Sequence, residues 1–230
     1  DALDLGQAQH LSLLSINKSP PGNDAPLTKA VVTLFANPLP ASTHTPKKAP
    51  SIGLHSYFES VGVLVSRPAP GGQLAVSIKA GGNLSHSHND IGSYTIALGA
   101  EQPTGDVGKT QYSAKTFSKE RTTIPSISSW GHPVPVVAGV LQNDASTIRP
   151  RVVATHLTDA SSDITINMAD AYTTPILRTL TRTLKHQRTP TGFVSITDRF
   201  EYKQPAAFEV AVTTVGHWQH NPDGSITLWE

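Results

Sequence analysis

The chain has 230 residues, of which 37% are hydrophobic and 15% are charged, and its formal net charge is +1 with neutral histidines. This length suits one large domain, or one domain with an appendage. The small net charge excludes a broad basic face for nucleic acid or an anionic membrane, while a local basic cleft for an acidic polymer stays open. The chain has no cysteine, which excludes disulfides and thiolate metal ligands.

The first part of the chain has no single repeating pattern. Residues 5–14 have weak helical periodicity, and residues 31–36 (VVTLFA) favour a short strand. Residues 37–53 are rich in Pro, Ser, Thr and Lys, a composition typical of an exposed linker. We therefore expect a domain junction near residues 45–55.

This junction divides the chain into a remnant or linker, residues 1–50, and one main domain, residues 51–230. No segment approaches the about 20 apolar residues of a membrane helix. The sequence has no signal peptide at its start and opens abruptly, as a mature or truncated chain does. We expect it to be part of a longer polypeptide.

After residue 55 the pattern is that of β-strands. In residues 73–80 the apolar side chains alternate, with Leu74, Val76 and Ile78 on one face. Asp223-Gly224 predicts a hairpin turn. The segments expected as strands are residues 61–67, 73–80, 93–99, 151–157, 162–172, 179–188, 192–200, 207–215 and 225–230. Because no long amphipathic helix follows residue 55, we predict an all-β fold, a large antiparallel β-sandwich.

The segment GGNLSHSHNDIGSY, residues 81–94, is the main candidate for a functional site. His86 and His88 are two residues apart, so in an extended segment their side chains leave the same face, about 7 Å apart. This spacing lets both bind one metal ion, or lets one bind metal while the other faces a substrate. By itself the pair also fits an exposed polar turn.

A cupin metal site is excluded by the residues that follow. The cupin motif needs a Glu a few residues after the second His, and the first Glu here is Glu101. Its second motif needs His-x-x-x-Asn, whereas His132 is followed by PVPV.

Five blocks, in order, resemble the C-terminal β-sandwich region of heparinase II/III-type polysaccharide lyases. Together they span about three quarters of the chain, and their order makes a chance likeness improbable. The blocks are YFESVGVLVSR, LAVSIKAGGNLSHSHNDIGSYTIAL, PTGDVGKTQYSAKTFSKER, SWGHPVPVVAGVLQ and LTRTLKHQRTPTGFVSITDRFEY.

The resemblance implies a zinc site and a neighbouring catalytic residue. His88, Asp106 and His132 would be the zinc ligands, with water or another group completing the shell. His86 would face the substrate as the catalytic histidine. Asn89 and Asp90 would brace the loop, and Asp90 is a candidate partner for an imidazole N–H.

Four further residues are candidates for substrate contacts, each with a structural alternative. Tyr112 could reach the cleft, although a half-buried strand position is favoured, and Trp130 could stack on a sugar, although a core position is favoured. Arg121 could pair with a substrate carboxylate or form a surface salt bridge. Asn83 could hold a carboxylate or shape the turn. Gln142 is expected to close a hydrogen bond within the sandwich.

The family resemblance implies cleavage of uronic-acid-containing polysaccharide by β-elimination, in a periplasmic or secreted location. In the family, the catalytic tyrosine lies in an N-terminal α/α-toroid, for which residues 1–50 are too short. We therefore expect the toroid or a companion chain as a partner, and weak or no activity of this chain alone. The alternatives are a uronate C5-epimerase and a non-catalytic β-sandwich that binds carbohydrate or packs against a partner.

Overall fold

A computed structural model describes residues 52–83, 88–108, 111–143, 148–189 and 192–229. In these residues the chain forms thirteen β-strands and four short 3₁₀ turns, and no α-helix. All strand pairs are antiparallel. The prediction of an all-β, antiparallel fold is confirmed. The predicted helical stretch at residues 5–14, the strand at 31–36 and the expected remnant or linker lie outside the described residues.

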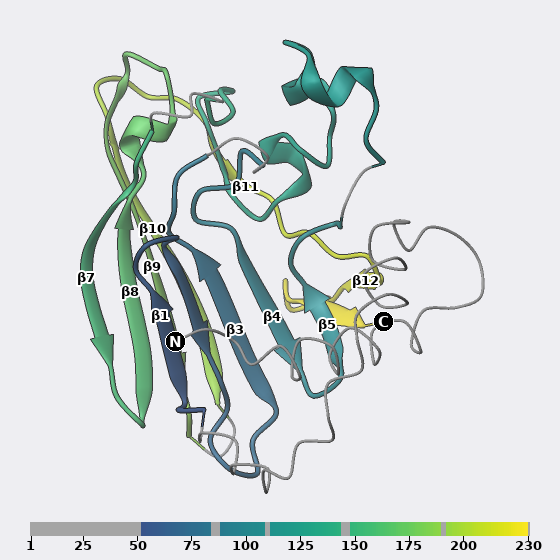
Figure 1. The fold of residues 1–230 in the computed structure, drawn as a ribbon, viewed down its shortest axis with the longest axis vertical. Coiled ribbons are helices and arrows are strands. Elements are labelled where there is room, and N and C mark those ends of the chain that lie inside the picture. The colour runs from purple at the N-terminus through teal and green to yellow at the C-terminus, as the bar shows by residue number, and fades with distance from the viewer. Residues whose placement is uncertain (1–51, 84–87, 109–110, 144–147, 190–191, 230) are drawn as a thin grey trace, which may run out of the picture. The chain divides into compact units, whose positions relative to one another are not determined.

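The first large sheet is a five-stranded meander in which each strand pairs with the next along the chain (Figure 1). Its order is therefore β1-β2-β3-β4-β5. The strands are β1 (His55–Phe58), β2 (Val63–Ser66), β3 (Leu74–Lys79), β4 (Tyr94–Leu98) and β5 (Glu101–Thr104).

The second large sheet has four strands in the order β10-β9-β8-β7. Two further strand pairs accompany the large sheets, β6 with β11 and the C-terminal hairpin of β12 with β13. The turn of this hairpin contains Asp223-Gly224, as predicted. The bounds are β6 (Pro135–Val137), β7 (Arg151–Leu157), β8 (Ser161–Asn167), β9 (Leu177–Gln187), β10 (Phe193–Tyr202), β11 (Phe208–Val210), β12 (His217–His220) and β13 (Ile226–Trp229).

The core lies between the two large sheets. Val76 and Ile78 alternate on the buried face of β3, as the period-two pattern predicts. Ile164 and Ile166 do the same on β8. These side chains belong to one apolar cluster, so the two sheets form a sandwich that shares one core.

Strand β9 contributes polar side chains to this buried interior. Its inward face carries Leu180, Arg182, Leu184 and His186 in alternation, and Arg188 continues the series just after the strand. All of these side chains are buried. The strand expected over residues 179–188 is confirmed. The burial of two arginines means that each needs hydrogen-bond partners inside the protein.

Four strands were not predicted, β1, β5, β6 and β12. β5 (EQPT) has no apolar alternation, and every residue of β12 (HWQH) is exposed. β5 and β12 therefore depend on pairing with a neighbouring strand rather than on a buried apolar face of their own. Conversely, the strand expected over residues 162–172 ends at Asn167, where a 3₁₀ turn, η4 (Ala169–Ala171), follows.

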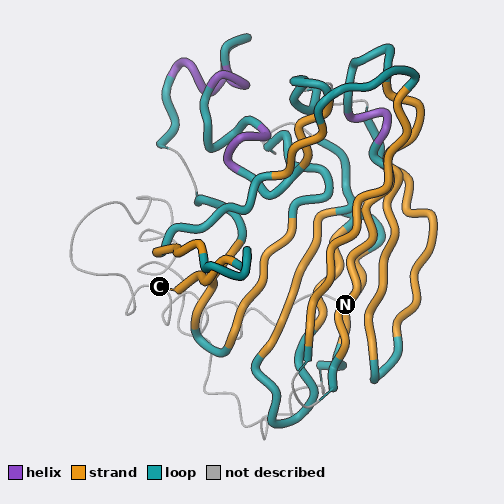
Figure 2. The backbone as a smooth tube through the Cα atoms, turned by 180° about the vertical axis from the view of Figure 1, so that it is seen from behind, coloured by secondary structure: helices purple, strands orange, loops and turns teal. Residues whose placement is uncertain are grey.

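The four short turns all lie at one end of the sheets (Figure 2). Three of them fall between β5 and β6, in the segment that carries Tyr112, Arg121 and Trp130. Their bounds are η1 (Ala114–Phe117), η2 (Arg121–Thr123) and η3 (Ser129–Gly131).

The double glycine of the GGN block is required by close backbone contacts. A Cβ on Gly81 would collide with the carbonyl oxygen of Val61, and one on Gly82 would collide with that of Ile148. Only glycine allows backbones to approach this closely. Gly81 and Gly82 therefore pack tightly against two neighbouring loops.

Gly92 has a positive φ of 84° and faces the sulfur of Met168 and the stem of Arg182. We expect Gly92→Ala to lower the free energy of unfolding by about 2–4 kcal/mol, since backbone strain and overpacking add. Urea denaturation measures the loss. Gly71→Ala is the matched control, because Gly71 has the same φ of 85° with open space around it, and it should lose only about 1–2 kcal/mol. Equal losses would contradict the predicted clash at Gly92.

The buried imidazole of His186 should make the stability of the protein depend on pH. Its Nδ1 lies 2.7 Å from the Ser66 hydroxyl, and burial, with the charge of Arg188, lowers the pKa of His186 below 6.5. Between its folded pKa and about 6.5, the imidazole of His186 binds a proton in the unfolded chain but not in the folded chain. The free energy of unfolding therefore decreases as pH falls from about 6.5 through the folded pKa. We expect His186→Gln to reduce the slope of unfolding free energy against pH in metal-free protein, by at most about 1.4 kcal/mol per pH unit. An unchanged slope would contradict the prediction.

Candidate metal centre

Three loops at the end of the five-stranded sheet bring together His88, Asp106 and His132. His88 lies between β3 and β4, Asp106 follows β5, and His132 directly follows η3. The meander places the end of β3, the start of β4 and the end of β5 at the same edge, because Ile78 pairs with Tyr94 and Ile96 with Thr104. Side chains far apart in sequence therefore meet at this edge.

The three side chains have the geometry of a metal site. Each offers one ligand atom, and these atoms all lie within 4.8 Å of one another. The Asp106 Oδ2 atom is 3.7 Å from Nδ1 of His88 and 3.5 Å from Nδ1 of His132. A tetrahedral zinc ion with bonds of 2.0–2.1 Å needs ligand atoms about 3.4 Å apart. The two distances from Asp106 are therefore close to the zinc spacing, and the two histidine nitrogens lie within 4.8 Å of each other.

His132 is fully buried, and neither of its ring nitrogens has a hydrogen-bond partner. Burial lowers the pKa of His132, outweighing the nearby Asp90 and Asp106 carboxylates. The ring is therefore neutral at pH 7, which is the form that binds metal. A buried imidazole without partners is costly, and a metal ion on one nitrogen would remove part of that cost.

Asp106 is ionised and is the most accessible of the three. Burial tends to raise its pKa, but contacts with His88, the Gly108 N–H and His132 outweigh this effect and lower it. The Gly108 N–H donates to Asp106 Oδ1 at 2.7 Å, which leaves Oδ2 facing the histidines. The side chains of Asp106 and His88 are 41% and 23% exposed, so one side of the group is open to solvent or a fourth ligand.

A buried hydrogen-bond network joins the His88 loop to the segment around His132. The Asn89 amide donates to the Gln142 carbonyl, and the Asn89 carbonyl accepts from Ser129 Oγ. The Gln142 side chain bonds both the N–H and the carbonyl of Ile91. Asn89 therefore braces the loop as expected, and Gln142 closes hydrogen bonds inside the sandwich as expected.

Asn83 is 2% exposed and belongs to the same network. Its amide nitrogen donates to the Asn143 carbonyl and its oxygen accepts from the Asp90 N–H. With both polar atoms engaged inside the protein, Asn83 shapes the turn. The alternative role, in which it contacts a substrate carboxylate, needs an exposure that this position lacks.

Asp90 forms an ion pair with Lys79, whose ammonium group also donates to the His88 carbonyl. The expected partner of Asp90 was an imidazole N–H. Its observed partner is a lysine at the end of β3, which holds the backbone of His88 instead of its ring. Nothing in the local sequence motif indicated Lys79, because the contact depends on β3 running beside the loop.

Tyr112 and Trp130 are more exposed than the sequence predicts. Tyr112 was favoured as a half-buried strand residue, but it lies in a loop, is 63% exposed and packs edge-on against Phe117. Trp130 was favoured as a core residue, but it is 60% exposed. Tyr112 lies in an exposed stretch of loop, whereas Trp130 is the exposed residue of an otherwise buried 3₁₀ turn, in which Ser129 and Gly131 are buried. Arg121 donates to the Thr116 carbonyl and is partly exposed, so it remains a candidate for substrate contact.

His86, the expected catalytic residue, lies outside the described residues. Its role stays a prediction that rests on its position two residues before His88.

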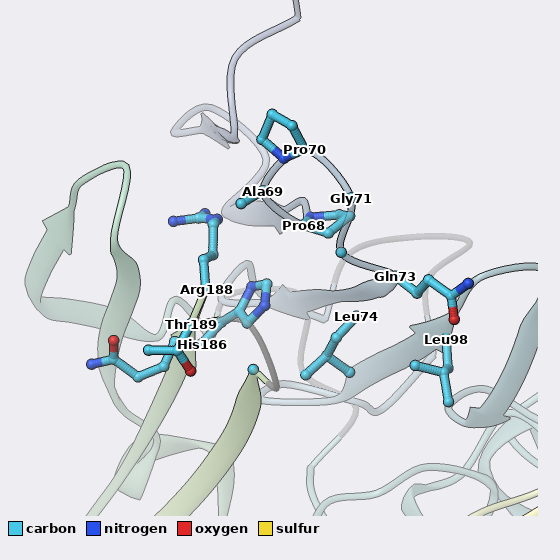
Figure 3. A pocket seen from close by; sticks show the side chains of 13 residues that line it. Pro68, Ala69, Pro70, Gly71, Gln73, Leu74, Leu98, His186, Arg188 and Thr189 are labelled. Carbon is cyan, nitrogen blue, oxygen red and sulfur yellow. The ribbon is translucent and has the colours of Figure 1, made fainter.

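A pocket of about 550 Å³ lies at the opposite end of the sandwich. It is lined by the Pro68–Gly72 turn, Leu74, Leu98, His186 and Arg188, among others (Figure 3). Leu74 pairs with Leu98 at the far end of the β3–β4 ladder from Tyr94. The pocket therefore shares no residue with the metal group.

The sequence matches no model of a known protein family and none of the curated proteins with which it was compared. Among the described residues, no helix has the length and apolar character needed to cross a membrane.

Proposed function

We propose that this chain is the β-sandwich part of a polysaccharide lyase, and that it contributes a zinc site and a catalytic histidine to β-elimination of uronic-acid-containing polysaccharide. The observation that supports this most is the convergence of His88, Asp106 and His132. The sequence resemblance assigned these three residues to one zinc ion, although they come from three separate loops. The buried, unpartnered ring of His132 fits a metal ligand.

Bound zinc would supply a positive charge that organises the loops and the water structure of the cleft. The reaction itself needs a base for the proton at C5 of the uronate and an acid for the leaving oxygen at C4. His86 is proposed to transfer one of these protons. The carboxylate of the substrate must also be neutralised so that negative charge can develop at C5, and Arg121 is the proposed cation in this chain.

The exposed aromatic side chains support a carbohydrate as the substrate class. Trp130 is adjacent to the Gly131-His132 pair, and Tyr112 packs against Phe117 in the loop after Asp106. Large exposed aromatic side chains beside a polar site are typical of ligand-binding surfaces. We propose that Trp130 and Tyr112 contact sugar rings on either side of the metal centre.

The test is cleavage of a panel of uronate polymers by the full-length protein, followed through the ultraviolet absorbance of the unsaturated product. His86→Ala should abolish the absorbance change while zinc content stays the same. A zinc-loaded protein that cleaves no uronate polymer would overturn the lyase proposal. Activity retained in His86→Ala would remove this residue from the mechanism.

The same polymers in deuterated water separate the alternatives. Deuterium entering the polymer at C5 without cleavage would identify a uronate C5-epimerase, because an epimerase returns the proton to the opposite face. Saturable carbohydrate binding with neither cleavage nor exchange would identify a non-catalytic binding sandwich. The toroid or companion chain expected to supply the catalytic tyrosine must be present in both experiments.

A further inference from the structure

Arg182 is a fully buried arginine whose donors point at two different loops. It lies on the inward face of β9, and its Nε and Nη2 atoms donate to the two carboxylate oxygens of Asp198 at 2.8 and 2.7 Å. Its Nη1 atom donates to the carbonyls of Gly92 at 2.9 Å and of Pro133 at 2.6 Å. One guanidinium group therefore holds two carbonyls that are distant in sequence.

These two carbonyls belong to the loops that carry the candidate histidine ligands. Pro133 follows His132 directly, and Gly92 lies four residues after His88 in the same β3–β4 loop. Both loops lie outside the four-stranded sheet to which Arg182 belongs. We propose that Arg182 is a positioning residue that sets the separation of His88 and His132 from the opposite sheet. Its effect on metal affinity rests on the metal centre proposed above.

The geometry requires arginine at this position. Asp198 lies directly opposite Arg182 in the β9–β10 ladder, and the planar fork of the guanidinium matches the carboxylate with two parallel bonds. This pairing compensates the buried charge and leaves the Nη1 atom directed at the two loops. A lysine has the charge but cannot bond Asp198 in a bidentate manner while also reaching both carbonyls.

Arg188 provides a matched control on the same strand face. It is six residues further along and is also buried, but its donors bond groups at the other end of the sandwich. These partners are the carbonyls of Leu54, Arg67, Thr158 and Asp159 and the hydroxyls of Ser66 and Ser162. None of them belongs to a loop with a candidate ligand, so Arg188 ties the sheets together without touching the metal centre.

The experiment compares Arg182→Met with Arg188→Met in two ways. Zinc affinity is measured by competition with a chromogenic chelator, and amide hydrogen exchange is measured in the metal-free proteins. Arg182→Met should lower zinc affinity by about 10–100-fold, the range typical of groups that orient metal ligands. It should also speed exchange at residues 89–93 and 132–134. Arg188→Met should leave zinc affinity within about twofold of the wild type, and exchange in these two loops should rise no more than it does in other loops of the same variant.

The milder variants Arg182→Lys and Arg188→Lys keep the buried charge and serve if either Met variant does not fold. Arg182→Lys should still weaken zinc binding and shift the absorption spectrum of the cobalt-substituted protein, whereas Arg188→Lys should do neither. Zinc affinity and loop exchange that stay unchanged in both Arg182 variants would overturn the positioning role. A wild type that binds no zinc would instead overturn the metal centre, and the exchange comparison would still decide whether Arg182 holds the loops.

Discussion

Replacing His132 by alanine is expected to lower zinc affinity more than 100-fold. His132 is the most buried of the three candidate ligands, and its neutral ring has no hydrogen-bond partner. Loss of this nitrogen leaves His88 and Asp106, and two ligands on separate loops hold zinc much more weakly than three. Elemental analysis of the purified protein and competition with a chelator measure the change.

His186→Ala is the control for this variant. His186 is also buried, but it bonds Ser66 and lines the pocket at the opposite end of the sandwich. It should lose stability and keep its zinc affinity. If His132→Ala binds zinc as tightly as the wild type, or if His186→Ala loses zinc to the same degree, the assignment of the metal centre is wrong.

Replacing Arg188 by methionine is expected to lower the free energy of unfolding by about 3–5 kcal/mol. The guanidinium group bonds four carbonyls and two hydroxyls drawn from both large sheets. Methionine fills a similar volume but offers no donor, so several of these buried acceptors lose a partner, at about 1–3 kcal/mol each. Water in the adjacent pocket would donate hydrogen bonds to some of these acceptors and so reduce the loss. Denaturant unfolding of the metal-free protein measures the loss.

Arg178→Met is the matched control, with Arg178 near the start of β9 and Arg188 just after its end. Arg178 pairs with Glu201 on the surface, where both side chains are 54% exposed. Exposed pairs of this kind contribute about 0–1 kcal/mol, so this variant should unfold almost as the wild type does. A loss of under about 1 kcal/mol in Arg188→Met would show that the acceptors find other partners and that Arg188 does not tie the two sheets together.

Local sequence patterns were sufficient to predict most of the strands. Apolar alternation in residues 73–80 identified β3, because a half-buried strand needs apolar side chains at every second position. Asp223-Gly224 identified the C-terminal hairpin. The strands β5 and β12 could not be found in this way. They carry no alternating apolar face, and only the partner strand supplies the hydrogen bonds that define them.

The candidate site was likewise predictable from the sequence only in part. The motif at residues 81–94 indicated by itself only that His86, His88 or both could bind a metal, and it also fitted a polar turn. The family resemblance then assigned His88 as a ligand and linked it with Asp106 and His132. Their spatial convergence depends on the antiparallel meander, which places the end of β3, the start of β4 and the end of β5 at the same end of the sheet. Sequence spacing contains no information about that return, since loops of many lengths can connect the same strands.

The sequence by itself therefore determined the all-β class, most of the strands and the residue types available for a metal site. The tertiary structure alone decided the contacts that surround the site. Lys79 as the partner of Asp90, the exposure of Trp130 and the bonds of Arg182 to both ligand-bearing loops all depend on how the chain folds back on itself. Hydrogen bonds and burial act over a few ångströms in space, so they become visible only when the fold brings the contacting segments together.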